Sequence, residues 1–361
     1  MVRSFASPRH TCLSRRPMPS RMQRSPPWNG STRRSRTAID APREERVTVK
    51  VAILGTRYRD LSIEEEILAP LGAEIVHGDG GSPEAIIEVA HGAGVILAGS
   101  GPRFDAGTLK QLEAGAIVRY GVGTESIDAA AAAALGMWVA YVPDYGTEAV
   151  AVHALTMALA AARRLQIADG TVKGGRWGIG DVRPLHLPSA QTAGVVGLGR
   201  IGRRSAELLA GVGYEVFGHD PFAETPGIRL GSLAEALAAD VVTLHAPGRE
   251  DGSPLIGRDE IALMSEGSVL VNTSRGSLID TAALVEGLEQ GRPAVAALDV
   301  FETEPPDVEV FATVLDRVIL TPHMAWYSEE SERDLRIKAA TEAARILGGE
   351  APLNVAATPG G

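Results

Sequence analysis

The stretch Val195-Val196-Gly197-Leu198-Gly199-Arg200-Ile201-Gly202 carries the sharpest structural signal in the chain. Its G-x-G-x-x-G spacing lies at the end of an apolar, strand-like run and opens a segment with helical spacing. In such a turn Gly197 allows the tight bend, Gly199 lets a pyrophosphate approach the backbone, and Gly202 lets the helix pack on the strand. The helix N-terminus adds N–H groups and a dipole that favour phosphate. The stretch therefore predicts a dinucleotide-binding turn.

An acidic residue follows at the spacing that this turn requires. The next strand-like run, Tyr214–His219, ends at Asp220, eighteen residues past Gly202. An isolated acid in a His-Asp-Pro sequence is more often a solvated turn residue, but the strand-end position favours a cofactor role. A carboxylate there accepts hydrogen bonds from ribose hydroxyls and repels a 2′-phosphate. We therefore predict NAD as the cofactor.

Short apolar runs alternate with helical segments along most of the chain, which indicates parallel sheets covered on both faces. We predict an α/β fold with two doubly wound parallel-sheet domains, a flavodoxin-like substrate domain and a Rossmann NAD domain. A long buried helix is expected over Thr147–Arg164, an irregular segment over Gly170–Ala190, and an amphipathic closing helix over Ser328–Leu347. The strands are expected at 47–55, 73–77, 94–100, 116–123, 137–142, 192–198, 214–219, 241–245, 268–273, 294–300 and 318–320.

The charge of the chain divides at residue 46. Residues 1–46 hold eleven arginines and three acids, a net charge of +8, so the formal total of −10 leaves −18 on residues 47–361. The tail is rich in Arg, Ser and Pro and is expected to be disordered. A transit peptide or a polyanion-binding segment would fit it; we favour a third interpretation, a true start near residue 47.

Several functional classes are disfavoured by composition. An acidic body argues against a nucleic-acid partner, and the one cysteine, Cys12, lies in the tail, which argues against disulfides and thiolate metal sites. No metal-ligand spacing is found, and no G-x-S-x-G of a hydrolase. The apolar run Ala149–Ala162 contains His153 and is too short to span a bilayer. We expect a cytoplasmic protein without a bound metal or a membrane partner.

Polar groups that could handle a carbonyl and a proton follow three later strand-like runs. Arg275 comes after Val271–Thr273, the acids Asp299 and Glu304 come after the next run, and His323 follows the last. A guanidinium can grip a carboxylate in bidentate fashion, and a carboxylate beside a histidine fixes its tautomer. Each residue alone is as easily a surface charge, but three successive strand ends favour a shared site.

With these motifs in order, residues 49–355 resemble the NAD-dependent D-isomer-specific 2-hydroxyacid dehydrogenase family. Pro322–Glu329, Val118–Gly123 and Val142–Ala151 most resemble its C-terminal-binding-protein branch. The resemblance implies hydride transfer between NAD(H) and C2 of a D-2-hydroxy acid or 2-oxo acid. It also implies a homodimer, formed through Thr147–Arg164 and its neighbours. We assign 47–146 plus 324–355 to the substrate domain and 147–323 to the NAD domain.

The resemblance also implies residue roles. His323 would be the acid/base, Glu304 its partner, and Arg275 the anchor of the substrate carboxylate. The implied cofactor residues are Gly197, Gly199, Arg200, Ile201, Gly202, Asp220, His245, Pro247, Thr273 and Asp299, with Asp299 at the nicotinamide carboxamide. The implied substrate residues are Arg119, Gly121, Gly123 and Trp326, together with Ser100 and Gly101. An interdomain packing role for Trp326 is an equally good interpretation.

Two other functions stay open at this point. A 3-phosphoglycerate dehydrogenase of serine synthesis would need cations for its phosphate, for which Arg103 and Arg119 are available, although Trp326 argues mildly against it. An NAD(H)-sensing corepressor-like protein would need a peptide groove, which no motif indicates. Family members commonly carry an acid where this chain has Val152. The other histidines, His77, His91, His153 and His186, lack matching partners in the sequence and are expected to be structural or exposed.

Overall fold

The computed structural model describes residues 49–56, 58, 60–223, 226–249 and 251–360. The basic tail, residues 1–46, lies outside the described residues, as does Cys12, so the expectations for both stay predictions. Among the helices that are described, none is long and apolar enough to cross a bilayer. Within the same residues, no group of three or more His, Cys, Asp or Glu side chains could hold a metal ion.

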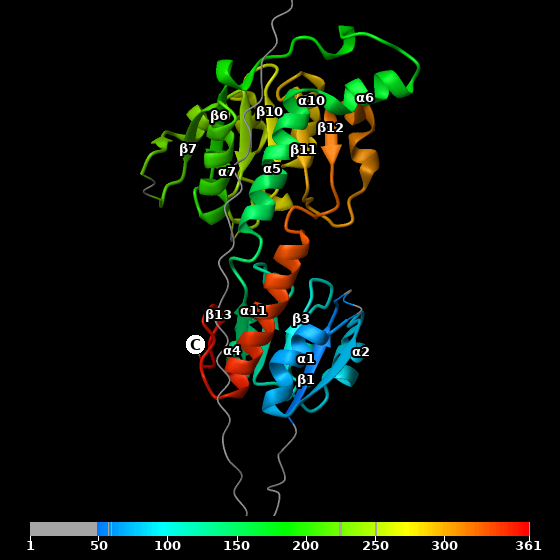
Figure 1. The fold of residues 1–361 in the computed structure, drawn as a ribbon, viewed down its shortest axis with the longest axis vertical. Helices are drawn as coiled ribbons and strands as arrows, with labels where there is room; N and C mark the ends of the chain where they lie inside the picture. The colour runs from blue at the N-terminus through cyan, green and yellow to red at the C-terminus, as the bar shows by residue number, and fades with distance from the viewer. Residues whose placement is uncertain (1–48, 57, 59, 224–225, 250, 361) are drawn as a thin grey trace, which may run out of the picture. The chain divides into compact units, whose positions relative to one another are not determined.

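The first sheet has the strand order β13-β5-β4-β3-β1-β2, in which β13 alone is antiparallel. Val51 and Ile53 face α1 and α11, whereas Ala52 and Leu54 face α2, α3 and α4, so alternate residues of one strand enter different cores. Figure 1 shows α11 beside α1. The bounds are β1 Val49–Leu54, α1 Ser62–Leu68, β2 Ala73–Gly78, α2 Pro83–Ala90, β3 Ala93–Ala98, α3 Ala106–Leu109, β4 Ala116–Arg119, α4 Ala129–Ala134, β5 Trp138–Tyr141, α11 Glu329–Leu347 and β13 Val355–Ala357.

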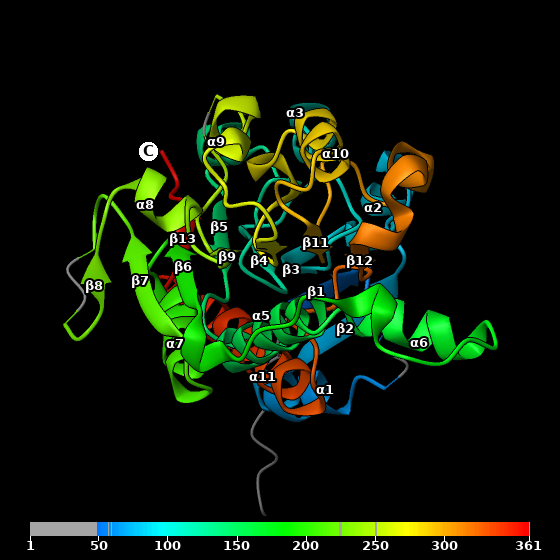
Figure 2. The same cartoon turned by 90° about the horizontal axis from the view of Figure 1, so that it is seen from above.

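The second sheet is wholly parallel, with the order β12-β11-β10-β9-β6-β7-β8. Helices α5 and α7 cover one face, and α8, α9 and α10 cover the other (Figure 2). The bounds are α5 Thr147–Ala162, α6 Leu165–Lys173, β6 Thr192–Val196, α7 Arg200–Gly211, β7 Glu215–His219, β8 Arg229–Leu230, α8 Leu233–Leu237, β9 Val241–Leu244, α9 Arg258–Ala262, β10 Val269–Asn272, α10 Thr281–Glu289, β11 Val295–Leu298 and β12 Val318–Leu320.

These strand orders confirm the predicted fold class. The run β2-β1-β3-β4-β5 is the flavodoxin-like order, and β8-β7-β6-β9-β10-β11 is the Rossmann order. The central strands of both sheets are almost completely buried, which explains why their sequences are continuous apolar runs rather than alternating ones. In sheets of this kind ligands bind beyond the carboxyl ends of the strands, so those ends decide where the site lies.

Three local predictions differ from the structure. The segment expected to be irregular from Gly170 begins with helix, because α6 continues to Lys173 and Lys173 pairs with Asp169 one turn earlier. The strand expected over 116–123 ends at Arg119, since Gly121 has a φ of 138° that a strand does not accommodate. The short strands β8 and β13 were not predicted, because two or three residues are too few to show periodicity.

Candidate active site

The turn between β6 and α7, Gly197–Gly202, is shaped by close backbone approaches. Gly197 has a φ of 90°, and a Cβ there would lie 2.6 Å from the carbonyl carbon of His245. A Cβ on Gly202 would lie 1.9 Å from the carbonyl oxygen of Gly197. By contrast, a Cβ on Gly199 would meet no atom within 4 Å. Two of the three glycines are therefore required by the protein's own packing, while Gly199 leaves space at the helix start.

The first turn of α7 supplies donors to that space. No side chain caps this twelve-residue helix at Gly199, and the side chain of Arg200 is exposed. Ile201, the next residue, is half-buried. Uncapped N–H groups and the positive end of the helix dipole favour a bound phosphate. We call Gly197–Gly202 with Asp220 the cofactor turn.

Asp220 is bonded directly to this turn. Its Oδ2 accepts a hydrogen bond from the Leu198 amide at 2.8 Å, and its Oδ1 accepts from the amides of Phe222 and Ala223 at 2.8 and 3.1 Å. Burial raises the pKa of Asp220, but the three amides outweigh that effect and hold the pKa below its ordinary value. An ionised carboxylate beside an open, uncapped helix start fits NAD. The carboxylate can accept hydrogen bonds from the ribose hydroxyls, and the backbone amides can bind the pyrophosphate.

Three side chains follow the ends of β10, β11 and β12, and we call them the catalytic edge: Arg275, Glu304 and His323. His323 Nδ1 lies 2.7 Å from Glu304 Oε2, and Glu304 Oε1 also accepts from the Phe301 amide at 3.1 Å. Both side chains are partly exposed, at 50% and 38%. The carboxylate therefore holds the ring with a proton on Nδ1 and leaves Nε2 free to exchange a proton.

Arg275 is positioned by the turn that follows β10. Asn272, which is buried, accepts the Ser274 amide and donates to the Arg275 carbonyl at 2.8 Å. A Cβ on Gly276 would lie 1.9 Å from the Phe301 carbonyl carbon, so only glycine lets this turn approach the end of β11. The guanidinium already has a partner, because Arg275 Nε donates a hydrogen bond to Glu125 Oε1 at 2.9 Å.

A second arginine, Arg119, ends β4 in the first sheet. Its Nη1 donates to the carbonyls of Ala98 and Tyr120, and its buried Nε has no hydrogen-bond partner among the residues described. Burial lowers the pKa of Arg119, although an arginine stays cationic at neutral pH. A Cβ on Gly121 would lie 3.6 Å from the Tyr145 hydroxyl and 3.7 Å from Arg119 Nη1. Glycine at 121 thus leaves room between a cation and a hydroxyl.

The predicted neighbours of these arginines are placed near them. A Cβ on Gly123 would lie 2.4 Å from Glu125 Oε2 and 3.2 Å from Arg275 Nη2, so this glycine touches the Arg275 pair. Trp326 is half-buried and stacks edge-to-face on Tyr145, with ring centroids 6.1 Å apart. Its contacts fit a packing role and a wall for substrate alike. Ser100 and Gly101 are exposed, and a Cβ on Gly101 would meet nothing within 4 Å.

Asp299 is the predicted cofactor residue whose surroundings are most closed. Its carboxylate is fully buried and accepts from the Thr321 hydroxyl at 2.6 Å and from the amides of Met324 and Ala325 at 2.9 and 2.8 Å. These contacts hold the turn that bears His323, so a nicotinamide contact of Asp299 stays a prediction. Thr273 is also buried, with a hydroxyl that is unpartnered among the described residues, whereas His245 is half-buried and Pro247 is exposed.

Three participants were missed from sequence. His153 was expected to lack partners, but its Nε2 lies 3.2 Å from the Thr321 hydroxyl and 3.6 Å from Asp299 Oδ1. Glu125 and Tyr145 border the two arginines. None of the three stands in a recognisable motif; the weak signal for His153 was a polar residue inside the apolar helix Thr147–Ala162.

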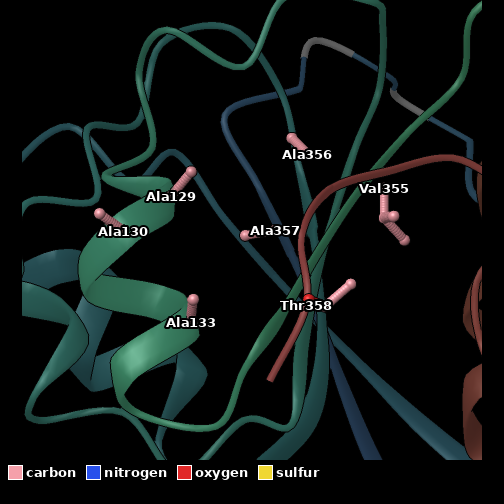
Figure 3. Close-up of a pocket in the computed structure, with 7 residues that line it drawn as sticks. All are labelled: Ala129, Ala130, Ala133, Val355, Ala356, Ala357 and Thr358. Atoms are coloured by element: carbon pink, nitrogen blue, oxygen red, sulfur yellow. The ribbon is translucent and has the colours of Figure 1, made fainter. Parts of the chain in front are cut away.

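Two pockets elsewhere do not include any predicted site residue. One of about 380 Å³ lies between α4 and β13 and is shown in Figure 3. Its lining is Ala129, Ala130, Ala133, Val355, Ala356, Ala357 and Thr358, so it offers little beyond methyl groups to orient a ligand. The other, of about 740 Å³, is lined by residues of α6, the Arg176–Asp181 loop and the starts of β11 and β12. Neither competes with the strand-end site.

Comparison with known proteins gives concordant matches. Residues 155–325 match the family described as D-isomer specific 2-hydroxyacid dehydrogenase, NAD binding domain. The chain is 34% identical to a D-3-phosphoglycerate dehydrogenase of Methanocaldococcus jannaschii over 86% of its length, but it spans only 60% of that relative. It is 33% identical to a glyoxylate reductase of Aeropyrum pernix, covering 75% of this chain and 85% of that one.

A solved structure extends the likeness to the fold as a whole. The D-lactate dehydrogenase of Aquifex aeolicus, complexed with NAD and lactic acid, superposes with a TM-score of 0.76 at 26% identity. The match covers 86% of this chain and 99% of that protein. Both parallel sheets therefore have counterparts in one known structure.

Proposed function

This chain belongs to the family of D-isomer specific 2-hydroxyacid dehydrogenases, and from that premise we propose that it interconverts a D-2-hydroxy acid and its 2-oxo acid with NAD as cofactor. The observation that carries the proposal is the 2.7 Å contact of His323 with Glu304, at the same edge of the sheet as the end of β10 that Arg275 follows. Residues 47–146 plus 324–355 would bind substrate and 147–323 would bind NAD.

The chain's own residues divide the work of the reaction. When bound, NAD supplies the chemistry that accepts or delivers a hydride at C2. In reduction, His323 Nε2 donates a proton to the C2 oxygen while Glu304 keeps hold of Nδ1. In oxidation, Nε2 takes that proton back. Arg275 binds the carboxylate of the substrate and stabilises the charge that develops on the C2 oxygen.

The substrate carboxylate must compete with Glu125 for Arg275. Glu125 already pairs with Arg275 at 2.9 Å, and that guanidinium is only 36% exposed. Arg119 adds a second cation, and Trp326 with Tyr145 adds aromatic surface. The resemblance of Pro322–Glu329 to the C-terminal-binding-protein branch fits a 2-oxo acid with a bulky or apolar side chain.

A 3-phosphoglycerate dehydrogenase is the second candidate, favoured by the Methanocaldococcus relative of that name. Its substrate phosphate needs cations beyond Arg275. Arg103 is exposed, and Arg119 is the same cation that an unphosphorylated acid would use, so it adds no charge specific to a phosphate. The geometry therefore favours the first candidate.

A substrate panel separates these functions. Full-length protein would be assayed for NADH oxidation with glyoxylate, hydroxypyruvate, phenylpyruvate and 3-phosphohydroxypyruvate. We expect turnover of at least one unphosphorylated acid; a clear preference for the phosphorylated one would establish the second candidate. Tight NADH binding with no turnover of any acid would instead identify an NAD(H)-sensing protein and overturn the proposal.

We also propose that the protein is cytoplasmic and forms a homodimer. The homodimer is supported by a group of exposed apolar side chains in and after α6. These are Leu165, Val172, Trp177, Ile179 and Leu187, of which Trp177 is 91% exposed. Solvated apolar groups of this size gather at protein–protein contacts, and they adjoin the predicted Thr147–Arg164 interface. Light scattering should give a dimer, and Trp177→Asp should shift it toward monomer; a monomeric wild type would refute the assignment.

A further inference from the structure

The residue that bears the proposed acid/base chemistry has an unfavourable backbone conformation. His323 has a φ of 52°; among the non-glycine residues that are described, Arg164 alone shares a positive φ. Left-handed conformations are strained for residues with a Cβ, and they persist only where neighbouring contacts impose them. At His323 the conformation is imposed by hydrogen bonds with Asp299.

The turn is tied to Asp299 from both sides of His323. The His323 amide donates to the Asp299 carbonyl at 2.9 Å, and the next two amides, of Met324 and Ala325, donate to the two oxygens of its carboxylate. Asp299 is fully buried. Its charge and position therefore dictate the direction in which the His323 side chain leaves the chain.

This buried carboxylate is itself supported by a histidine from another element. In the described part of the chain no lysine or arginine lies within ion-pair distance of Asp299; the group that does is His153 Nε2, 3.6 Å from Oδ1. His153 projects from α5 and is 18% exposed. The Thr321 hydroxyl lies between the two, 2.6 Å from Asp299 and 3.2 Å from His153.

The available protons fix the direction of the hydrogen bonds among His153, Thr321 and Asp299. A carboxylate can only accept, so the single Thr321 proton is donated to Asp299. The Thr321 oxygen must then accept from His153, which requires a proton on His153 Nε2. A partly satisfied buried network would be costly, so each of these donors matters to the others.

We propose that His153 is a positioning residue for the reaction: its Nε2–H, acting through Thr321 and Asp299, holds the turn 321–325 that presents His323. This inference rests on the proposed role of His323. Loss of the donor leaves the Thr321 oxygen without its partner and removes one of the contacts around the buried Asp299 carboxylate. The turn then relaxes from its left-handed conformation, and His323 no longer meets the C2 oxygen at the correct angle.

The test compares a variant that removes the donor with one that keeps it. His153→Leu should lower kcat about 10- to 100-fold, as expected for a misplaced catalytic group. His153→Gln retains an N–H donor and should restore most of kcat. Thr321→Val should resemble His153→Leu, and Thr321→Ser should resemble wild type. His186→Leu, at an exposed histidine, is the matched control and should leave turnover unchanged.

Two further readouts separate positioning from a general loss of structure. NADH affinity measured by fluorescence should change far less than kcat in His153→Leu, since the cofactor turn, which would bind the pyrophosphate and ribose, lies on other strands. In ¹⁵N-histidine NMR spectra, His153 should carry its proton on Nε2, and the His323 signals should move in His153→Leu but not in His153→Gln.

The outcomes also distinguish this inference from the proposed function. If His323→Ala keeps its turnover, the proposed function fails. If His323→Ala is inactive while His153→Leu matches wild type, or while His153→Gln falls as far as His153→Leu, the positioning role alone is wrong. Unmoved His323 signals in His153→Leu would overturn it in the same way.

Discussion

The cofactor turn and the catalytic edge lie at carboxyl ends of one parallel sheet, yet they are built from different parts of the chain. At the cofactor turn, Gly197 and Gly202 meet backbone atoms, and Asp220 accepts three backbone amides. At the catalytic edge the decisive contacts are between side chains, His323 with Glu304 and Arg275 with Glu125. The first is defined mainly by backbone contacts, and the second by pairs of side chains.

This contrast predicts that the two regions fail differently when altered. Changes at the cofactor turn should affect binding of NADH and the stability of the fold, because backbone packing is disturbed. Changes at the catalytic edge should affect turnover, because the side chains there are partly exposed and carry little packing. Four measurements test this division.

The largest effect is expected at the catalytic edge. His323→Ala removes the proton donor, and a positioned acid/base is worth about 10²- to 10⁴-fold in rate. Turnover of the preferred 2-oxo acid should therefore fall by about 10³-fold, with NADH affinity unchanged. Steady-state kinetics and NADH fluorescence titration would measure the two quantities. A comparable loss of NADH affinity would show that the two regions are not separable.

The glycines of the cofactor turn provide a matched set. Gly202→Ala places a methyl group against the Gly197 carbonyl and should cost about 1–3 kcal/mol of stability as well as NADH affinity. Gly199→Ala meets no protein atom, so it should leave stability intact and weaken NADH binding alone. Gly211→Ala, at the last residue of α7 and unobstructed, should stabilise by at most about 0.5–1 kcal/mol without affecting NADH.

Denaturant unfolding and NADH titration of the three variants would check this order. The decisive comparison is between Gly199→Ala and Gly202→Ala, since they differ in steric surroundings and not in chemistry. Equal loss of stability in both would mean that the open space at Gly199 is not a ligand space.

How far the sequence predicts each region follows from the same contrast. The Gly197–Gly202 motif and Asp220 could be identified because a turn that needs glycine leaves a short, regular pattern. The strands could be located because burial on both faces makes them continuously apolar. The support of His323 could not, since it depends on α5 packing His153 against the end of β12, 168 residues away from it in sequence. Nor could the Glu125 pair with Arg275, which spans 150 residues.

His245, which packs against the cofactor turn, predicts a pH dependence of stability. Burial lowers its pKa to about 4, below the ordinary value of about 6.5. The unfolded chain therefore binds a proton that the folded chain refuses, so stability is complete above pH 6.5 and falls as the pH drops toward 4. Each unit of pKa shift is worth about 1.4 kcal/mol, and the half-buried ring keeps some contact with solvent. The free energy of unfolding should therefore fall by about 2 kcal/mol over this range.

Unfolding of the cofactor-free protein between pH 4 and 7 would measure this dependence. His245→Asn should have a shallower pH profile than wild type, and His186→Asn, at an exposed site, should keep the wild-type slope. Identical slopes in all three proteins would exclude His245 as the origin.

The smallest effect is expected at Glu125, the carboxylate that pairs with Arg275 of the catalytic edge. Burial raises the pKa of Glu125, but the charge of Arg275 and the hydrogen bonds lower it overall, so Glu125 is ionised at neutral pH and occupies the guanidinium that the substrate needs. Because the Glu125 side chain is 70% exposed, solvent screens this pair, which is worth about 0.2–1 kcal/mol, and Glu125→Gln should lower KM for the 2-oxo acid by about two- to fivefold without changing kcat. Glu113→Gln, at an exposed acid, is the control for a change in net charge and should leave KM unaltered.

The advantage of Glu125→Gln should shrink as salt is added, since both the pair and the substrate contact are electrostatic. A rise in KM would instead mean that Glu125 holds Arg275 in its binding geometry, which would make this pair part of the substrate site and not a competitor for it.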